Sequence, residues 1–137
     1  MGAEITIYNP ETLGAPLGQY SHVTRVIGAT ETLYIAGMLA GAPGGEIVGV
    51  GDFDAQTTRV FKNVEAALKS GGMTWSNVVQ FTTYMVHSQD IPKFMKWRER
   101  NFPGMFANGK YPPNTLLMVD RLVNEAFLIE VQTIAAR

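Results

Sequence analysis

The sequence predicts an α/β (α+β) fold, in which a mixed sheet carries both of its helices on one face. Short runs rich in β-branched and aromatic residues are separated by glycine and proline, which is typical of strands and turns. Two longer runs instead repeat their apolar residues at three- and four-residue steps, as one face of a helix does. Along the chain these runs follow the order β-β-β-α-β-α-β-β, which favours one sheet with both helices on the same side.

Three strands are expected before the first helix. Residues 22–28 (HVTRVIG) and 32–40 (TLYIAGMLA) are joined by a short polar link, so we expect them to pair antiparallel. The stretch GAPGGE at 41–46 is interpreted as a hairpin tip that leads into a third strand over residues 46–51. It lacks the Gly-Lys-Ser/Thr ending of a phosphate-binding loop.

The first helix is expected to begin at Phe53, with Asp52 as its N-terminal cap. Gly71 and Gly72 are expected to end it in a left-handed conformation. Its apolar face contains Phe53, Val60, Phe61, Val64, Ala67 and Leu68.

The second helix is expected to begin after Asp90, because Pro92 is tolerated only in a first helical turn. We expect Pro103 and Gly104 to disrupt it near its end. The residues that share its apolar face are Ile91, Phe94, Met95, Arg98, Phe102 and Met105.

Three further strands are expected at residues 77–88, 115–122 and 125–136. On the last strand, alternate residues point to opposite faces of the sheet, and both sets are largely apolar. Two helices cover one face only, so a second copy of the chain is the simplest cover for the other, and we predict a homo-oligomer. The alternative is a monomer whose sheet curls on itself.

The composition fits one domain over residues 1–137, with 46% apolar and 17% charged residues. The formal net charge of −1 provides no long-range field for nucleic acid or an anionic membrane, which argues against both partners. No apolar run approaches the roughly 20 residues that span a bilayer, and no signal peptide is evident at the start. Cysteine is absent and neither histidine has a ligand partner at metal-binding spacing, so we expect no metal, no cofactor and a cytoplasmic location.

Glu130 is the residue that stands out, because it lies mid-strand with apolar neighbours in FLIEVQTI. Carboxylates are rarely buried unless they are paired or functional. A half-buried glutamate with a raised pKa can orient water or move a proton. The alternatives are an ion pair with Arg121 or Arg98, or an edge position facing water. Arg98 is the counter-ion for Glu130 that we consider first. The alternative is that the Arg98 side chain extends to the surface and does not pair with Glu130.

The chain resembles the reactive intermediate deaminase (Rid) family, also called the YjgF or L-PSP endoribonuclease family. The matching pieces, in order, are LGQYSHV, LYIAG, DFDAQTTRVFKNVEAALKSGG, VVQFTTYMV, PPNTLLMVDRL and LIEVQTIAA. The resemblance implies a chorismate-mutase-like (YjgF-like) fold with a mixed six-stranded sheet. It also implies a homotrimer with a central β-barrel and small-molecule clefts between subunits.

Active members of this family hydrolyse imines and enamines without a metal or an organic cofactor. The resemblance assigns Glu130 the role of positioning the attacking water, and it places Tyr20 and Gly37 along the cleft. The family arginine that holds the substrate carboxylate is here Asn114. An amide cannot supply the charged, bidentate fork of a guanidinium.

Two further departures make the expected cleft less polar, because Ala36 and Met38 replace the polar residues that flank the strand glycine in the family. Arg98 and Arg25 are the cations considered as replacements for the missing arginine. Loss of a charged anchor for a buried carboxylate costs on the order of 2–5 kcal/mol.

Three functions remain open. The first is hydrolysis of an imine, enamine or related C–N bond of a non-standard substrate, with Glu130 as the catalytic residue and Asn114 as a hydrogen-bond donor. The second is a non-catalytic trimer that binds a metabolite. The third is the endoribonuclease activity in the family label, which the near-neutral charge and the absence of a catalytic histidine pair disfavour.

Overall fold

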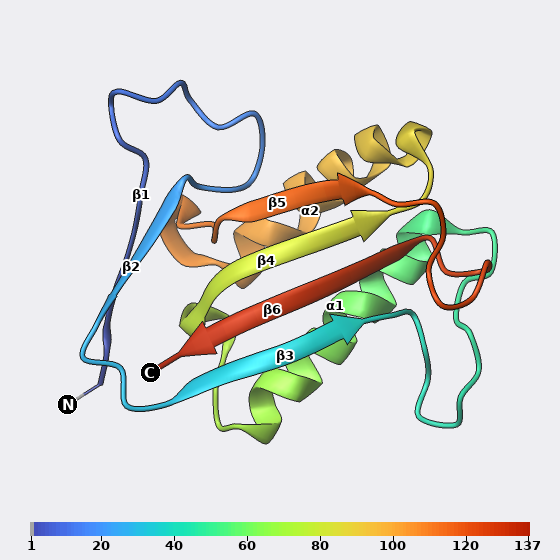
Figure 1. The fold of residues 1–137 in the computed structure, drawn as a ribbon, viewed down its shortest axis with the longest axis horizontal. Helices are drawn as coiled ribbons and strands as arrows, with labels where there is room; N and C mark the ends of the chain where they lie inside the picture. Colours follow the sequence, from blue (N-terminus) through green and yellow to red (C-terminus); the bar gives the residue numbers. More distant parts are fainter. Residues whose placement is uncertain (1) are drawn as a thin grey trace.

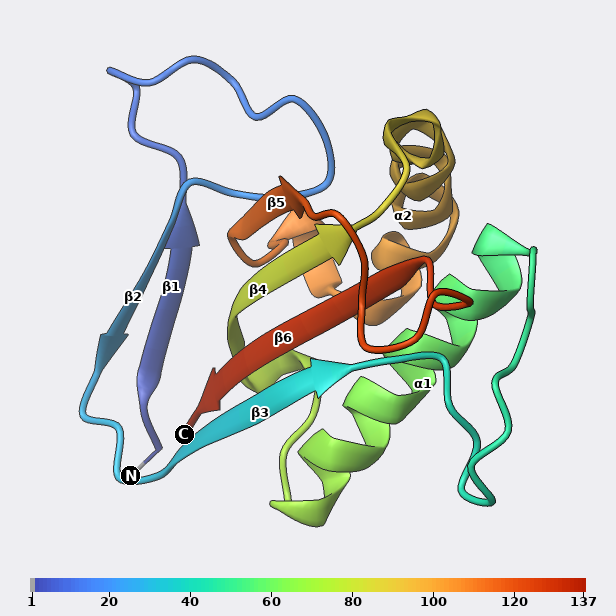
Figure 2. The same cartoon turned by 45° about the vertical axis from the view of Figure 1, so that its right-hand side comes forward.

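The computed structural model describes residues 2–137 (Figure 1). Its long helices are α1 (Phe53–Ser70) and α2 (Ile91–Met105). Its strands are β1 (Glu4–Tyr8), β2 (Val23–Ile27), β3 (Thr32–Met38), β4 (Val78–Met85), β5 (Asn114–Met118) and β6 (Ile129–Ala136). Both helices lie on one face of the main sheet, as predicted (Figures 1 and 2).

The six strands are divided between two sheets rather than joined in one. The main sheet is mixed and has the order β3-β6-β4-β5, with β4 and β5 parallel and the other pairs antiparallel. Strands β1 and β2 form a separate antiparallel ribbon beside it (Figure 2). The Thr24 hydroxyl ties this ribbon to β4 by donating to the Val79 carbonyl at 2.8 Å.

The expected pairing of residues 22–28 with residues 32–40 is therefore wrong. Strand β2 pairs with β1, whose sequence EITIY alternates as a strand does and was not assigned from the sequence. Strand β3 pairs instead with β6, which lies at the other end of the chain. The short link between residues 22–28 and residues 32–40 did not make these two strands pair with each other. Each of them pairs instead with a strand that is not its neighbour across that link.

The expected strand at residues 46–51 is also wrong. Its only β contact within the described residues is an isolated bridge from Ile47 to Gly41. Gly49 and Gly51 have φ values of +73° and +75°, in the left-handed region that ends a strand. The chain turns there in order to enter α1.

Helix α1 has the predicted ends. The Asp52 side chain accepts a hydrogen bond from the Ala55 N–H at 3.0 Å, which satisfies one free donor of the first turn. Gly72 has φ +70°, and the Met73 N–H then donates to the Leu68 carbonyl at 2.9 Å. This is the left-handed ending expected of the glycine pair.

Helix α2 begins at Ile91 as predicted, but the expected disruption at Pro103 and Gly104 is wrong, because the helix continues to Met105. Proline removes one backbone N–H donor from the helix. Because Pro103 lies so near the end of α2, this loss affects only the last turn. The Phe106 N–H still closes the helix by donating to the Phe102 carbonyl at 2.9 Å.

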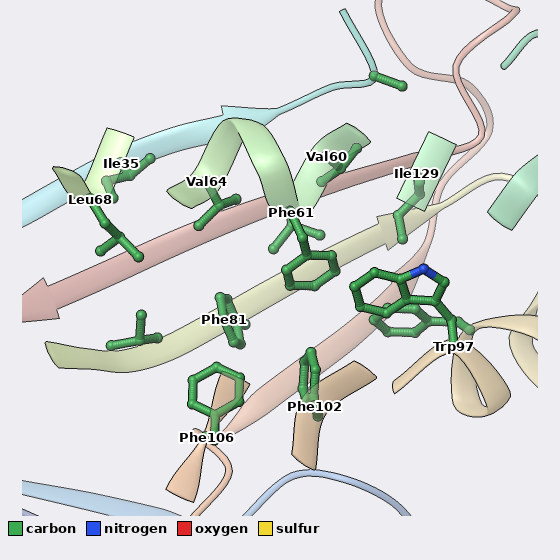
Figure 3. Packing of buried hydrophobic residues seen from close by; sticks show 14 of the residues in the cluster. Ile35, Val60, Phe61, Val64, Leu68, Phe81, Trp97, Phe102, Phe106 and Ile129 are labelled. Atoms are coloured by element: carbon green, nitrogen blue, oxygen red, sulfur yellow. The ribbon is translucent and has the colours of Figure 1, made fainter. Parts of the chain in front are cut away.

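The space between the helices and the sheet is filled largely by aromatic rings (Figure 3). The Phe61 ring stacks on Trp97 at 4.8 Å between centroids and meets Phe81 edge-on at 5.7 Å. Phe102 and Phe106 close the cluster beside β4. We call this side of the main sheet the helix-covered face, and the other side the open face.

Strand β6 alternates between these faces as the sequence predicted. Ile129, Val131 and Thr133 are buried on the helix-covered face, while Glu130 and Gln132 lie on the open face. No helix among residues 2–137 is long and apolar enough to cross a membrane.

Candidate functional site

Glu130 lies on a central strand of the main sheet, between β3 and β4. It is half-buried, and its register partner on β4 is Tyr84. This excludes the edge-strand alternative for Glu130, because β6 has a neighbour on both sides. The carboxylate therefore projects from the middle of the open face.

The chain leading into β6 is fixed by one buried side chain of α1. The Gln56 amide donates to the Ala126 carbonyl at 2.8 Å, and its oxygen accepts from the Leu128 N–H at 2.8 Å. Both bonds hold backbone within four residues of Glu130, and Gln56 is fully buried. A helix on the covered face thus sets the position of a carboxylate on the open face.

Gly37 makes room for that carboxylate. The register between β3 and β6 shifts between Ile35 and Met38, so β3 has one extra residue in a β-bulge there. A Cβ placed on Gly37 would lie 2.6 Å from the carboxyl carbon of Glu130, closer than real Cβ atoms approach. Only glycine lets the Glu130 side chain rest in its present position.

Glu130 is also unpaired within the described chain. Burial raises its pKa above the ordinary value of 4.5, and no neighbouring charge contributes to that shift. The two arginines considered as partners lie elsewhere, because Arg121 pairs with Glu125 at 3.1 Å and Arg98 is on the helix-covered side. A carboxylate whose pKa is raised in this way accepts a proton more readily than an exposed one.

Asn114 lies on the opposite face of the sheet from Glu130. It is aligned with Phe81 at the start of β5, and its side-chain oxygen accepts a hydrogen bond from the buried Thr83 hydroxyl at 2.7 Å. Asn114 and Glu130 therefore do not share a site within one chain.

Arg98 and Tyr20 form a second group on the helix-covered side. Arg98 is buried at 4% exposure and its guanidinium lies 4.4 Å from the centroid of the Phe94 ring. Tyr20 is close enough to raise the pKa of Arg98 electrostatically, against a larger lowering by burial. Arg25, the other cation considered, is exposed on β2 of the separate ribbon.

The structure thus joins the expected site residues in two groups, Glu130 with Gly37 and Arg98 with Tyr20, and leaves Asn114 with Thr83. Sequence reasoning missed Thr83 because its partner lies 31 residues away, and only the parallel β4–β5 register brings the two together.

A cavity of about 510 Å³ lies away from both groups and opens between β1 and the end of α2. None of the expected site residues lines it. Within the described part of the chain, no cluster of three or more histidine, cysteine or acidic residues is arranged to hold a metal ion.

Residues 12–137 match the protein family described as Endoribonuclease L-PSP. A RutC family protein of Pyrococcus horikoshii is 34% identical over 126 residues, covering 91% of this chain and 92% of the relative. Another, from Saccharolobus solfataricus, is 32% identical over 123 residues and covers 89% and 90%.

Solved structures show the same fold. A protein of unknown function of the conserved Rid family, YyfB from Yersinia pestis, superposes with a TM-score of 0.84 at 30% identity, covering 97% of this chain and 98% of that one. Escherichia coli TdcF, solved with bound serine, has a TM-score of 0.70 at 21% identity, over 96% and 98% of the two chains. The chain therefore belongs to the L-PSP endoribonuclease family, also known as the Rid or YjgF family, and has its α+β fold.

Proposed function

We propose that this chain is a cofactor-free hydrolase that acts on an imine, enamine or related C–N bond of a small molecule. The observation that carries the proposal is the Glu130 carboxylate, half-buried and without a charged partner on the open face, resting against Gly37. An unpaired glutamate on a rigid central strand has the position and the raised pKa that general acid–base catalysis requires.

The chemistry needs one carboxyl group and one water. The substrate reacts as the protonated iminium. As water adds to its carbon, the Glu130 carboxylate accepts a proton from the water and a neutral carbinolamine forms. The carboxylic acid then returns its proton to the nitrogen, the C–N bond breaks as the hydroxyl oxygen becomes the carbonyl oxygen, and the hydroxyl proton leaves with the ammonia as ammonium, so that Glu130 is again a carboxylate. An enamine requires prior protonation at carbon, which gives the corresponding iminium.

The substrate should differ from an ordinary 2-imino acid. Asn114 supplies a neutral amide where the family arginine holds a carboxylate, and a charged anchor of that kind contributes on the order of 2–5 kcal/mol. We therefore expect neutral imines or enamines to be better substrates than those held only by a carboxylate at position 114.

A cleft that contains both Glu130 and Asn114 requires more than one copy of the chain, because the two residues lie on opposite faces of one sheet. We propose a homotrimer with the open faces turned inward as a barrel. Tyr34 at 80% and Leu117 at 41% exposure support this, because they leave apolar surface on the open face. Sedimentation equilibrium at micromolar concentration tests the trimer, and a stable monomer would exclude it.

The cytoplasmic location stays a prediction, which cell fractionation would test.

A non-catalytic trimer that binds a metabolite is the second candidate. The loss of the family arginine at Asn114 favours it, because the Thr83 hydroxyl holds the amide oxygen at 2.7 Å and only neutral N–H donors remain for a ligand. The endoribonuclease activity in the family description is the least supported, because the net charge of −1 gives RNA no electrostatic attraction.

The deciding experiment measures ammonia release from a panel of 2-imino acids and neutral enamines. We expect Glu130→Gln to abolish release, and Glu125→Gln to retain it, since Glu125 is exposed and paired with Arg121. If no substrate turns over, or if Glu130→Gln has no effect, the hydrolase proposal fails and the binding candidate takes its place. Asn114→Arg should raise turnover of 2-imino acids if position 114 anchors the carboxylate.

A further inference from the structure

The cavity between β1 and the end of α2 lies apart from the residues considered for catalysis. Its volume of about 510 Å³ falls within the roughly 300–1,000 Å³ of pockets that hold small molecules. Val78 and Phe106, which are 1% and 5% exposed, give it an apolar floor. Its apolar lining as a whole consists of Ile5, Ile7, Trp75, Val78, Met105 and Phe106.

Two aromatic rings shape the wall of this cavity. The ring centroids of Trp75 and Phe106 lie 5.8 Å apart, with the rings inclined at 62°. The Trp75 indole N–H donates to the Glu65 carboxylate at 3.1 Å, so the half-buried ring is held in place. Aromatic faces pack well against other flat rings, and the flexible thioether of Met105 can fill the remaining gaps. The wall therefore suits a flat aromatic molecule.

The charge of the cavity lining is positive. Lys110 is the one charged side chain among the described residues that line it, and no acidic residue does. Lys110 takes part in none of the ion pairs formed within residues 2–137. An anionic group is therefore the ligand feature that complements the cavity.

A left-handed turn places Lys110 beside the cavity. Asn108 and Gly109 have φ values of +59° and +66°, a conformation that asparagine and glycine adopt more easily than other residues. The Lys110 N–H closes the turn by donating to the Ala107 carbonyl at 3.1 Å. The position of the cation thus follows from the backbone after α2.

Strand β1 adds free backbone groups to the cavity. Ile5, Thr6 and Ile7 all line it, and because successive side chains of a strand alternate, three consecutive lining residues mean that the cavity follows the edge of the strand. Within the described chain β1 pairs with β2 alone, so the sheet does not use the N–H and C=O groups of its other edge. These groups can hydrogen-bond a polar substituent of a ligand.

We propose that this cavity is a second binding site, which takes a flat aromatic molecule with one anionic group. The rings of the ligand pack against Trp75 and Phe106, and its anionic group lies at Lys110. None of the residues considered for catalysis or substrate binding lines the cavity. Binding here is therefore separate from the proposed hydrolysis and does not rest on it.

Anilinonaphthalene sulfonate (ANS) tests the site, with phenylnaphthylamine as its control, because the two dyes share their rings and differ in the sulfonate. The readouts are dye fluorescence and the NMR signals of the indole N–H groups of Trp75 and Trp97. Only Trp75 lines this cavity, so we expect ANS to shift its signal and to leave that of Trp97 unchanged. A shift of both would place the dye in the smaller hollow that the two tryptophans share, and would overturn the proposal. Binding that leaves the Trp75 signal unchanged would do the same.

Lys110→Met removes the charge and keeps an apolar side chain, and Lys96→Met is the matched control, since Lys96 is exposed on α2 and does not line the cavity. Lys110→Met should weaken ANS binding about two- to fivefold, the strength of an exposed ion pair, and should not change phenylnaphthylamine binding. Lys96→Met should change neither. Equal wild-type affinity for the two dyes, or undiminished ANS binding in Lys110→Met, would overturn the proposal.

The other candidate occupant is an extended segment of a second copy, paired with the free edge of β1. ANS would then compete with assembly, and sedimentation in the presence of the dye would show a lower oligomeric order. An unchanged oligomeric state supports the small-molecule site, and a dye-induced loss of order would overturn it. Glu130→Gln should bind ANS as the wild type does, so a failure of the hydrolase proposal is distinguishable from a failure of this one.

Discussion

The two faces of the main sheet use side chains in opposite ways. On the helix-covered face, aromatic rings fill the space between α1, α2 and the strands, with Phe61 in contact with Trp97 and Phe81 (Figure 3). On the open face, Glu130 has no charged partner and Tyr34 is 80% exposed. The stability of one chain therefore comes mainly from the first face, while Glu130, the residue proposed for catalysis, lies on the second.

Truncation of the aromatic core is the largest change we expect. Phe61→Ala should lower the free energy of unfolding by about 3–5 kcal/mol, because Phe61 lies at the centre of the ring cluster and a cavity would remain. Tyr34→Ala on the open face should cost within about 0.5 kcal/mol in the isolated chain. Urea unfolding of both variants at a concentration where the chain is monomeric measures the difference. Equal losses under that condition would break the comparison, because the open face would then contribute as much to the stability of one chain as the aromatic core does.

A side chain at Gly37 should produce the next largest effect. Gly37→Ala places a methyl group against the Glu130 carboxyl and should cost about 1–3 kcal/mol as an overpacked contact. In a Glu130→Ala background the same substitution should cost much less, because the obstructing group is gone. A double-mutant cycle by urea unfolding gives the coupling energy, and additive losses would show that Gly37 is needed for the bulge rather than for Glu130.

Much of the fold could be predicted from the sequence, because periodicity reports local structure directly. The repeat from Phe53 to Leu68 and the caps at Asp52 and Gly72 determined α1, and the alternation after Ile129 determined which face Glu130 occupies. Strand partners were predicted less well. The pairing of β2 with β1 and the division into two sheets depend on contacts that no local pattern encodes.

The candidate site was predicted residue by residue but not in its arrangement. Glu130 stood out because a carboxylate among apolar neighbours is unusual, and Gly37 came from the family resemblance. The sequence did not reveal that Asn114 faces away from Glu130, since this follows from the β4–β5 register. It also did not reveal that Arg98 is buried with its Nε and Nη1 atoms unbonded, because helical spacing does not determine the hydrogen-bond partners of a side chain.

Removal of the Thr83 hydroxyl tests the side-chain hydrogen bond that joins β4 to the start of β5 on the helix-covered face. Thr83→Val keeps the side-chain shape but leaves the Asn114 oxygen without its donor, so the free energy of unfolding should fall by about 1 kcal/mol. Thr82→Val, on the open face, is the matched control and should be nearly neutral. If Thr83→Val is also neutral, Asn114 is free to turn toward a ligand.

The smallest expected effect is the dependence of stability on the charge of Glu130. Burial raises the pKa of Glu130 in the folded chain above its ordinary value of 4.5. At pH values above 4.5 and up to that raised pKa, the folded chain retains a proton that the unfolded chain has lost. The contribution of Glu130 to stability therefore falls as the pH rises through this window, and stays low above it.

Glu130→Gln removes this titration, so the variant should be more stable than the wild type at neutral pH and should lose that advantage as the pH falls toward 4.5. Urea unfolding of both proteins between about pH 4 and pH 8 measures the difference, with Glu125→Gln as an exposed control that should show no such trend. A difference that does not vary with pH would mean that Glu130 has an ordinary pKa. The open face would then hold a solvated carboxylate, and the contrast between a stabilising face and a reactive one would lose its main support.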